Sequence, residues 1–303
     1  MKNDYFQCTV ECLKPDPDRK GYFLLTEPHL LYMSEDQAGS YLKAMENPDY
    51  TSSFHNPTVK IIESNLPEIF RDFGKGVSLI DLGPGYPDKS MPIAKYLRQR
   101  GIPCKYVPVD ISSSFLEIAK KSIAPIAEQV YPIHDRFETC LEQIPSEVYQ
   151  YTTYCMIGLT FMNFVPEHIL ILLKDIARDQ GRVIIASELI TKQNTTEKII
   201  NSYRARETKL VGFGPLQHLG LNIDELAYNP VFSNGRVELQ FQLKAKPGDI
   251  LQRLGVKEGN TIITAVSYRY TKDEINALMG RYFKRHHTFL SMDGATALAV
   301  GEQ

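Results

Sequence analysis

Short apolar runs alternate with amphipathic helical patterns through the middle of the chain. Turn residues bound each apolar run, which is typical of a buried strand, and the segments between them repeat their apolar positions with a helical period. We expect strands beginning at Val77 and over Lys105–Asp110, Gln129–His134, Tyr151–Gly158 and Gly181–Glu188, and helices over Pro57–Phe73, Lys89–Arg100, Phe115–Ile126 and Pro166–Arg178. Because strands that alternate with helices pair in parallel, this pattern predicts a doubly wound α/β sheet.

The pattern changes after Glu188. It predicts a polar helix over Thr196–Lys209, which is followed by the segments Gly212–Pro215 and Leu216–Leu226. Arg236–Lys244 alternates apolar and polar residues, as a half-exposed antiparallel strand does, and a second strand is expected over Asn260–Tyr270. This block therefore reads as an inserted α+β region.

The two ends of the chain also differ from the central pattern. After the insertion, a helix over Asp273–Phe283 and a hairpin around Asp293-Gly294 complete the chain, since Asp-Gly is a strong turn signal. At the other end, the prolines of Pro15–Asp18 indicate turns, and a helix is expected over Ser34–Met45. An irregular aromatic segment over Asn47–His55, with Tyr50, precedes the predicted sheet.

Composition and charge narrow the possible partners. The 303 residues carry a formal net charge of −2, with 34 Lys and Arg against 36 Asp and Glu, so no global field attracts nucleic acid or anionic lipid. No apolar run approaches the roughly 18 residues of a membrane span. The chain is therefore expected to have neither nucleic-acid nor membrane partners.

The five cysteines form no Cys-x-x-Cys spacing and are odd in number. This pattern predicts neither a zinc site nor a disulfide framework. Reduced thiols are the default inside the cell, so the expected location is cytoplasmic. No metal is expected.

Candidate chemistry gathers where the first strand ends, in the sequence Asp81-Leu-Gly-Pro-Gly85. Gly83 and Gly85 allow the backbone to approach a ligand closely because they carry no Cβ. Open α/β sheets bind ligands at the carboxyl ends of their strands. A purely structural strand-to-helix turn is the alternative for so short a motif.

Two nucleotide ligands compete for this turn. A dinucleotide fingerprint needs a third glycine three positions after the second, where this chain has Asp88. Carboxylates at Asp81 and Asp88 repel a pyrophosphate but suit S-adenosylmethionine (SAM), which carries a sulfonium and an amino group. Asp110, at the end of the second strand, suits the ribose hydroxyls of either ligand, and Asp135 after the third strand is a candidate for the adenine amino group.

Three segments together resemble the histidine-specific SAM-dependent methyltransferase family, whose best-known members trimethylate the α-amino group of histidine on the way to ergothioneine. They are Asp81–Ser90, Tyr106–Ser112 and Gly158–Phe164, which read DLGPGYPDKS, YVPVDIS and GLTFMNF. The resemblance runs from about Tyr50 to the C-terminus. It implies a Rossmann-like class I methyltransferase sheet with a substrate lid.

The resemblance assigns roles residue by residue. It implies cofactor contacts at Gly83, Gly85, Lys89, Asp110 and Gly158, to which Asp135 and Tyr50 are added here. It places Asn163 in the substrate pocket, orienting the amine, and has Tyr203 meet the substrate carboxylate; Ser267, in a lid strand, is a further candidate. The predicted cofactor-binding core comprises residues 56–193 and 276–303, and the predicted lid comprises residues 1–55 and 194–275.

The chain departs from the family pattern at three places. The family's lid strand reads Thr-Glu-x-Ser, and here Ala265 replaces the acid that holds an imidazole. Met162 stands where a glycine usually precedes the pocket asparagine, and the Arg-Thr-Glu element of the family is not evident near Tyr50–Thr58. An imidazole nitrogen without its partner costs roughly 1 to 3 kcal/mol, so a substrate other than histidine is expected.

These observations predict a SAM-dependent N-methyltransferase acting on the amine of an amino acid or of a small molecule derived from one. An O- or C-methyltransferase of a secondary pathway is the first alternative. A non-catalytic binding protein with the same fold is the second.

Overall fold

The computed structural model describes residues 2–35, 37, 39, 56–71 and 73–303. The chain divides into two compact units, each formed by two stretches of sequence. One unit comprises Met1–Ala44 and Thr195–Tyr268, and the other comprises Met45–Asn194 and Arg269–Gln303. The predicted helix over Ser34–Met45 lies largely outside the described residues, and the predicted cofactor contact Tyr50 lies entirely outside them.

The second unit is built on a mixed sheet with the strand order β12-β13-β8-β7-β3-β4-β5, and β6 also pairs with β4. The strands are β3 (Val77–Leu82), β4 (Cys104–Asp110), β5 (Gln129–Val130), β6 (Ile133–His134), β7 (Thr152–Ile157), β8 (Arg182–Glu188), β12 (Arg285–Leu290) and β13 (Thr296–Glu302). β13 runs antiparallel to both of its neighbours, β8 and β12, while the pairings among β3 to β8 are parallel. The parallel sheet predicted from the apolar runs is confirmed.

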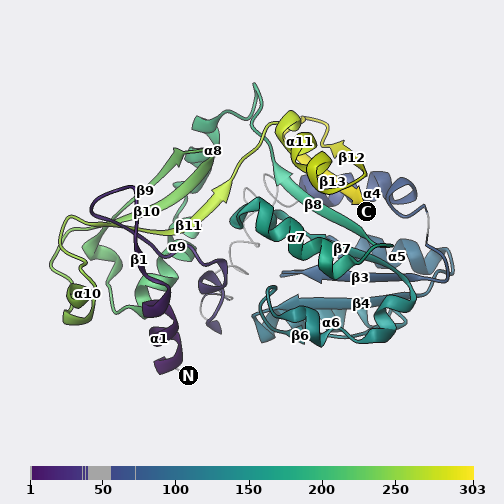
Figure 1. The fold of residues 1–303 in the computed structure, drawn as a ribbon, viewed down its shortest axis with the longest axis horizontal. Helices are drawn as coiled ribbons and strands as arrows, with labels where there is room; N and C mark the ends of the chain where they lie inside the picture. The colour runs from purple at the N-terminus through teal and green to yellow at the C-terminus, as the bar shows by residue number, and fades with distance from the viewer. Residues whose placement is uncertain (1, 36, 38, 40–55, 72) are drawn as a thin grey trace. The chain divides into compact units, whose positions relative to one another are not determined.

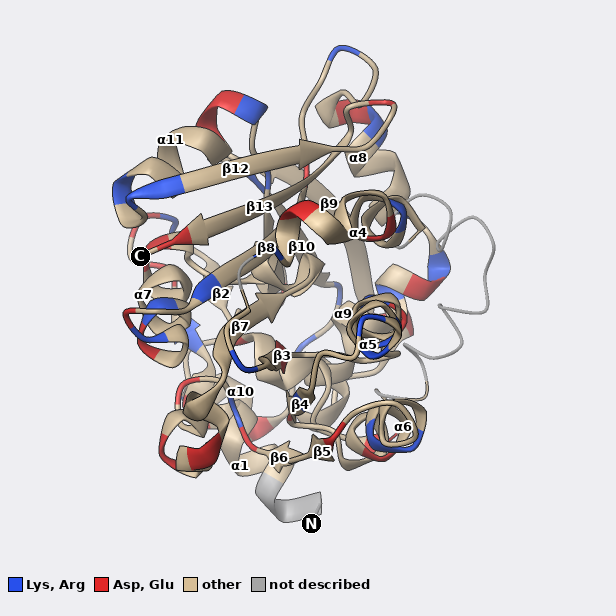
Figure 2. Ribbon diagram, turned by 90° about the vertical axis from the view of Figure 1, so that its right-hand side faces the viewer, with Lys and Arg blue, Asp and Glu red and all other residues tan. Residues whose placement is uncertain are grey.

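Helices cover both faces of this sheet, as Figure 2 shows. They are α4 (Asn56–Ile69), α5 (Ser90–Gln99), α6 (Ser113–Ile123), α7 (Pro166–Ala177) and α11 (Lys272–Tyr282), with short 3-10 helices η3 (Cys140–Gln143), η4 (Ser146–Gln150) and η5 (Leu159–Asn163). α4, α5 and α6 pack on one face and α7 and α11 on the other, which gives two apolar layers. Every residue of β3, β4 and β8 is buried, which explains why these strands are mostly apolar in the sequence.

Hydrogen bonds to side chains cap the first turns of two of these helices. Ser112 is the N-cap of α6 and accepts a hydrogen bond from the backbone N–H of Phe115. Thr271 and Glu274 form a capping box at the start of α11. The expected third strand is instead two short strands separated by Tyr131 and Pro132, since a proline cannot donate to the ladder of hydrogen bonds.

The first unit contains a five-stranded sheet with the order β1-β2-β11-β10-β9. Its strands are β1 (Lys14–Pro15), β2 (Tyr22–Leu24), β9 (Leu226–Ser233), β10 (Arg236–Leu243) and β11 (Thr261–Tyr268), and its helices are α1 (Lys2–Cys12), η1 (Pro28–Leu31), α8 (Thr196–Tyr203), α9 (Arg206–His218), η6 (Ile223–Glu225) and α10 (Asp249–Arg253). Figure 1 labels α1, β1, α8, α9, β9, β10, α10 and β11 of this unit.

One prediction in this unit is wrong. The single helix expected over Thr196–Lys209 is two helices, and Gly212–Pro215 lies inside the second of them, α9. A Cβ on Gly212 would lie 2.9 Å from a methyl carbon of Leu239 in the sheet, and one on Gly214 would collide with the Gln37 side chain. These glycines therefore allow α9 to pack closely, rather than ending it.

Within the residues that the structure describes, no helix combines the length and apolar character needed to cross a membrane.

Candidate functional site

The strand order of the larger sheet reverses at β3, which lies between β4 and β7. Both neighbours run parallel to β3, so the carboxyl ends of all three strands meet at the same edge. Gly83 follows β3 and Gly158 follows β7 directly. These residues therefore lie at the switch point of the sheet, the edge at which α/β proteins of this kind bind their ligands in a crevice.

The glycine turn after β3 takes a backbone shape that favours glycine. Gly83 has φ +67° and Gly85 has φ +52°, both in the left-handed region. A Cβ on Gly83 would lie 3.2 Å from the ring of Phe137 and 3.5 Å from the hydroxyl of Thr160. The turn is thus held close to the loops that follow the neighbouring strands.

Lys89 and Gly158 meet in this crevice. Lys89 lies at the N-cap of α5, and its side chain passes so close to Gly158 that a Cβ there would lie 2.8 Å from its Cε. The Lys89 Nζ lies 3.7 Å from Oδ1 of Asp88, and its charge also lowers the pKa of Asp81 against the effect of burial. Two residues far apart in sequence, both predicted as cofactor contacts, therefore lie together.

Asp110 ends β4 at the same edge and is buried. Its Oδ1 accepts a hydrogen bond of 2.9 Å from the backbone N–H of Ser112, and the N–H groups of Gly85 and Ile111 also stabilise its charge. Burial outweighs these bonds and raises the pKa of Asp110 to about 6. Asp110 and Gly85 are thus linked directly.

Asp81 is the second buried carboxylate of the site and is the last but one residue of β3, two positions before Gly83. Its Oδ2 accepts hydrogen bonds from the Tyr106 hydroxyl at 3.0 Å and from the Ser90 hydroxyl, and burial raises the pKa of the carboxyl. Its Oδ1 is buried without a hydrogen-bond partner among the described residues. Sequence reasoning did not identify Tyr106 and Ser90, because neither belongs to the glycine turn.

Asp135 lies beside Asp110, since its backbone N–H donates to the Asp110 carbonyl oxygen at 3.2 Å. Its carboxylate is occupied locally: it accepts from the backbone N–H of Arg136 at 2.7 Å, from the Thr139 hydroxyl at 2.8 Å and from the Gln143 amide. The carboxylate is half-buried, and these bonds fix its position at the crevice.

Asn163 is the last residue of η5, the 3-10 helix that follows β7 and Gly158. The preceding residue, Met162, is buried, and its sulfur accepts from the backbone N–H of Glu188 at 3.3 Å and from Arg269 at 3.2 Å. Arg269 in turn pairs with Glu188 at 3.0 Å. The methionine that departs from the family pattern therefore anchors the η5 loop to the end of β8.

The two remaining candidates, Tyr203 and Ser267, belong to the other unit. The backbone carbonyl of Tyr203, at the end of α8, accepts from the Tyr228 hydroxyl at 2.7 Å. Ser267 is buried in β11, opposite Val237. The β10–β11 pairing shifts at Leu239 and Gln240, so that Thr264 is an extra residue, a β-bulge next to Ala265.

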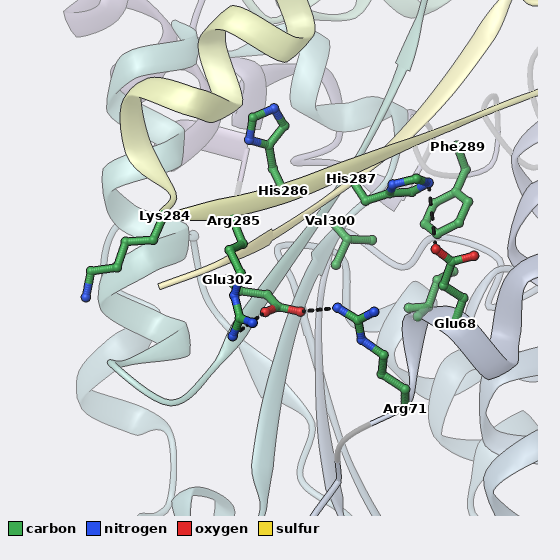
Figure 3. A pocket seen from close by; sticks show the side chains of 10 residues that line it. Glu68, Arg71, Lys284, Arg285, His286, His287, Phe289, Val300 and Glu302 are labelled. Carbon is green, nitrogen blue, oxygen red and sulfur yellow. Dashed lines mark hydrogen bonds and ion pairs between the residues drawn. The ribbon is translucent and has the colours of Figure 1, made fainter.

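A separate groove lies at the opposite edge of the larger sheet (Figure 3). Glu302, at the end of β13, pairs there with Arg285 at 3.0 Å, Arg182 at 3.2 Å and Arg71 at 3.4 Å. Because Arg182 begins β8, this groove lies at the amino end of that strand. The groove is therefore distinct from the crevice described above, which lies at the carboxyl ends of the strands. The side chains of His286 and His287 point in different directions from β12 (Figure 3).

Comparison with known families and proteins gives one sequence match. A family described as "Histidine-specific methyltransferase, SAM-dependent" matches residues 26–301. Among the curated proteins, no match is found.

Solved structures resemble the chain in fold. The CMeT domain of the citrinin polyketide synthase matches with a TM-score of 0.50 at 11% identity over 87% of this chain, which spans 59% of the length of that one. The plantazolicin methyltransferase BpumL, solved with a monoazolic desmethylPZN analog and SAH, matches with a TM-score of 0.45 at 13% identity over 100% of this chain and 99% of its own. DesVI of Streptomyces venezuelae gives a TM-score of 0.40 at 12% identity, over 89% of this chain and 98% of its own. At 11% identity, the match with the CMeT domain shows the fold alone.

Proposed function

Since this chain belongs to the histidine-specific SAM-dependent methyltransferase family, we propose that it methylates the amine of an amino acid or of a small molecule derived from one. The chain is a SAM-dependent methyltransferase with the class I α/β fold. The nature of the acceptor and the residues that bind it form our proposal. The observation that supports it best is the position of Asn163 on the loop after β7, next to the crevice.

The crevice residues fit SAM in charge. Three carboxylates, on Asp81, Asp88 and Asp110, and one ammonium, on Lys89, surround the glycine turn. SAM carries two positive groups, the sulfonium and the amine, and one carboxylate. An acidic site with a single lysine complements that distribution, whereas a pyrophosphate would face three like charges.

The crevice also fits SAM in hydrogen bonding. Asp81 Oδ1 is a buried acceptor without a hydrogen-bond partner among the described side chains, which suits a donor such as the cofactor amine. We propose that Asp110 accepts the ribose hydroxyls, that Gly83, Gly85 and Gly158 give the ligand close access to the backbone, and that Lys89 meets the cofactor carboxylate. Asp135 is proposed at the adenine, and Tyr50 stays a predicted cofactor contact.

When bound, SAM supplies a methyl group activated by its positively charged sulfur. The chain's part is then mainly to hold the acceptor nitrogen in line with that methyl group, since orientation supplies much of the barrier reduction. We propose that Asn163 fixes the neutral amine with a hydrogen bond, while the contact between Met162 and the Glu188–Arg269 pair holds the loop in place. The amine loses its proton to solvent before transfer, so no dedicated base is required.

The substrate is proposed to be other than histidine. Ala265 lies buried in β11 where the family pattern has an acid, and the neighbouring Thr264 hydroxyl is buried without a hydrogen-bond partner in the described part of the chain. Neither side chain carries a negative charge that could pair with a protonated imidazole. Tyr203 and Ser267 stay predicted substrate contacts, and residues 1–55 and 194–275 stay the predicted lid.

Cofactor binding is expected to weaken below pH 6. The pKa of Asp110 is about 6, so the carboxylate that accepts the ribose hydroxyls becomes protonated as the pH falls through that value. Affinity should therefore fall about tenfold between pH 7 and pH 5, measured by calorimetric titration with S-adenosylhomocysteine (SAH). Asp110→Asn should bind weakly and show a flat profile over the same range. Equal affinity of the unaltered chain at pH 5 and pH 7 would contradict this role of Asp110.

The acceptor class is tested with a panel of amino acids and small amines, each paired with the analogue in which a hydroxyl replaces the amine. The chain and SAM are incubated with each compound, and products are detected by mass spectrometry as a gain of one methylene unit. We expect methylation of one or more amines and none of the matching alcohols. Methylation of the alcohol, or of a carbon atom, would establish the O- or C-methyltransferase alternative instead.

A further inference from the structure

The unit that contains the five-stranded sheet brings together three metal-ligand side chains. Cys8 and Cys12 are four residues apart on α1, so their side chains lie on the same face of the helix, one turn apart. His29 comes from η1, after the chain has passed through β1 and β2. All three side chains are half-buried.

The distances suit a single ion. The ligand atoms of Cys8, Cys12 and His29 all lie within 4.8 Å of one another. The sulfur of Cys8 and Nε2 of His29 are 3.7 Å apart. In a tetrahedral zinc site, bonds of about 2.3 Å to sulfur and 2.0 Å to nitrogen place neighbouring ligand atoms about 3.5 to 3.8 Å apart. The Cys8–His29 distance falls in this range, and all three ligand atoms lie within 4.8 Å of one another, close enough for small side-chain shifts to complete the geometry.

The donor set selects the kind of metal. Thiolate and imidazole ligands favour zinc among the abundant divalent ions, whereas calcium and magnesium require oxygen ligands. The other cysteines, Cys104, Cys140 and Cys155, are buried in the other unit and do not take part.

We propose that Cys8, Cys12 and His29 bind one Zn²⁺ through two sulfurs and Nε2, and that the ion fastens α1 to η1. Binding converts two thiols to thiolates, so two protons are released to solvent for each ion bound and no electrons are transferred. The fourth position is left to water, as in other sites with three protein ligands. None of the residues proposed for methyl transfer belongs to this site. The proposal differs from the sequence prediction, which expected no zinc site from the spacing of the cysteines.

The surroundings support this arrangement. The Tyr5 ring of α1 lies 5.3 Å from the ring of His218 in α9, which holds the helix that carries both cysteines. α1 is thus positioned by packing, and the ion adds a second attachment.

The test uses the full chain, reduced and treated with a chelator, then titrated with Co²⁺ and separately with Zn²⁺. We expect one equivalent of Co²⁺ to give the intense visible absorption of a tetrahedral thiolate site together with a sulfur-to-metal charge-transfer band, and Zn²⁺ to displace it. Calorimetry in two buffers of different ionisation enthalpy should show about two protons released. Zn²⁺ should also raise the melting temperature of the chain.

Variants separate the cluster from the rest of the chain. Cys8→Ala, Cys12→Ala and His29→Ala should each weaken Zn²⁺ binding by about a hundredfold or more. Cys104→Ala and His286→Ala, a buried thiol and an exposed imidazole elsewhere, should bind as the unaltered chain does. Circular dichroism establishes that each variant is folded.

Three results would overturn the proposal. They are an unaltered chain that binds no Co²⁺ or Zn²⁺, a Co²⁺ spectrum without a thiolate band, and Zn²⁺ affinity that survives substitution of both α1 cysteines. None of these measurements uses methyltransferase activity, so their outcome is independent of the proposed function.

Discussion

Asp110→Ala is expected to abolish the binding of SAM. The carboxylate is buried at the end of β4 and is held in place by backbone N–H groups, among them that of Ser112 at 2.9 Å. Two hydrogen bonds from ribose hydroxyls to a charged acceptor contribute about 3 to 6 kcal/mol together, so their loss weakens binding by roughly 10² to 10⁴-fold. Calorimetric titration with SAH measures this loss.

The control for this variant is Glu117→Ala. Glu117 is an exposed acid on α6, the helix that follows Asp110, so this change removes the same charge nearby without touching the crevice. It should bind SAH with unchanged affinity. If Asp110→Ala also binds SAH with unchanged affinity, and a cooperative melting transition shows that the variant is folded, the crevice at the ends of β3 and β4 is not the ribose site.

Asn163→Ala is expected to lower turnover about a hundredfold while the affinity for SAM stays the same. Asn163 is proposed to fix the acceptor amine, and an acceptor that is misplaced by about 1 Å can lose two orders of magnitude in rate. The loss should therefore appear in kcat with the amine substrate. Single-turnover kinetics and SAH titration measure the two effects separately.

His168→Ala provides the comparison for Asn163. His168 is exposed in the first turn of α7, shortly after η5. Its replacement by alanine should leave both the turnover and the affinity for SAM unchanged. A turnover of Asn163→Ala within a few-fold of the unaltered chain would remove the amine-orienting role. The O- or C-methyltransferase alternative would then be favoured.

The larger sheet could be predicted from sequence because its strands leave a strong pattern. β3, β4 and β8 are buried along their whole length, so they appear as apolar runs between turn residues. The segment over residues 129–134 was less predictable, since Pro132 divides it into two strands of two residues.

The smaller unit was less predictable for a different reason. Gly212 and Gly214 indicate a break when only local propensity is considered, yet they are helical because α9 packs closely against neighbouring side chains. A glycine required by packing has the same local signal as a glycine that ends a helix. Only the partner, here Leu239 or Gln37, distinguishes them.

The candidate site was predictable where its residues adjoin the strand ends. Gly83, Asp110 and Gly158 follow or end parallel strands, and such positions meet at one edge. The hydrogen bonds from Tyr106 and Ser90 to Asp81 could not be predicted, because they depend on side-chain directions within the core. The Cys8, Cys12 and His29 group was missed because a search for Cys-x-x-Cys overlooks the four-residue spacing of a helix face.

A crystal structure of the full chain with SAH tests the central claim most directly. The account predicts the ribose hydroxyls on Asp110, the amine of SAH at Asp81, its carboxylate at Lys89, and its sulfur facing the loop that carries Asn163. Ligand density at any other position, such as the groove around Glu302, or a ribose held by residues other than Asp110, would contradict it.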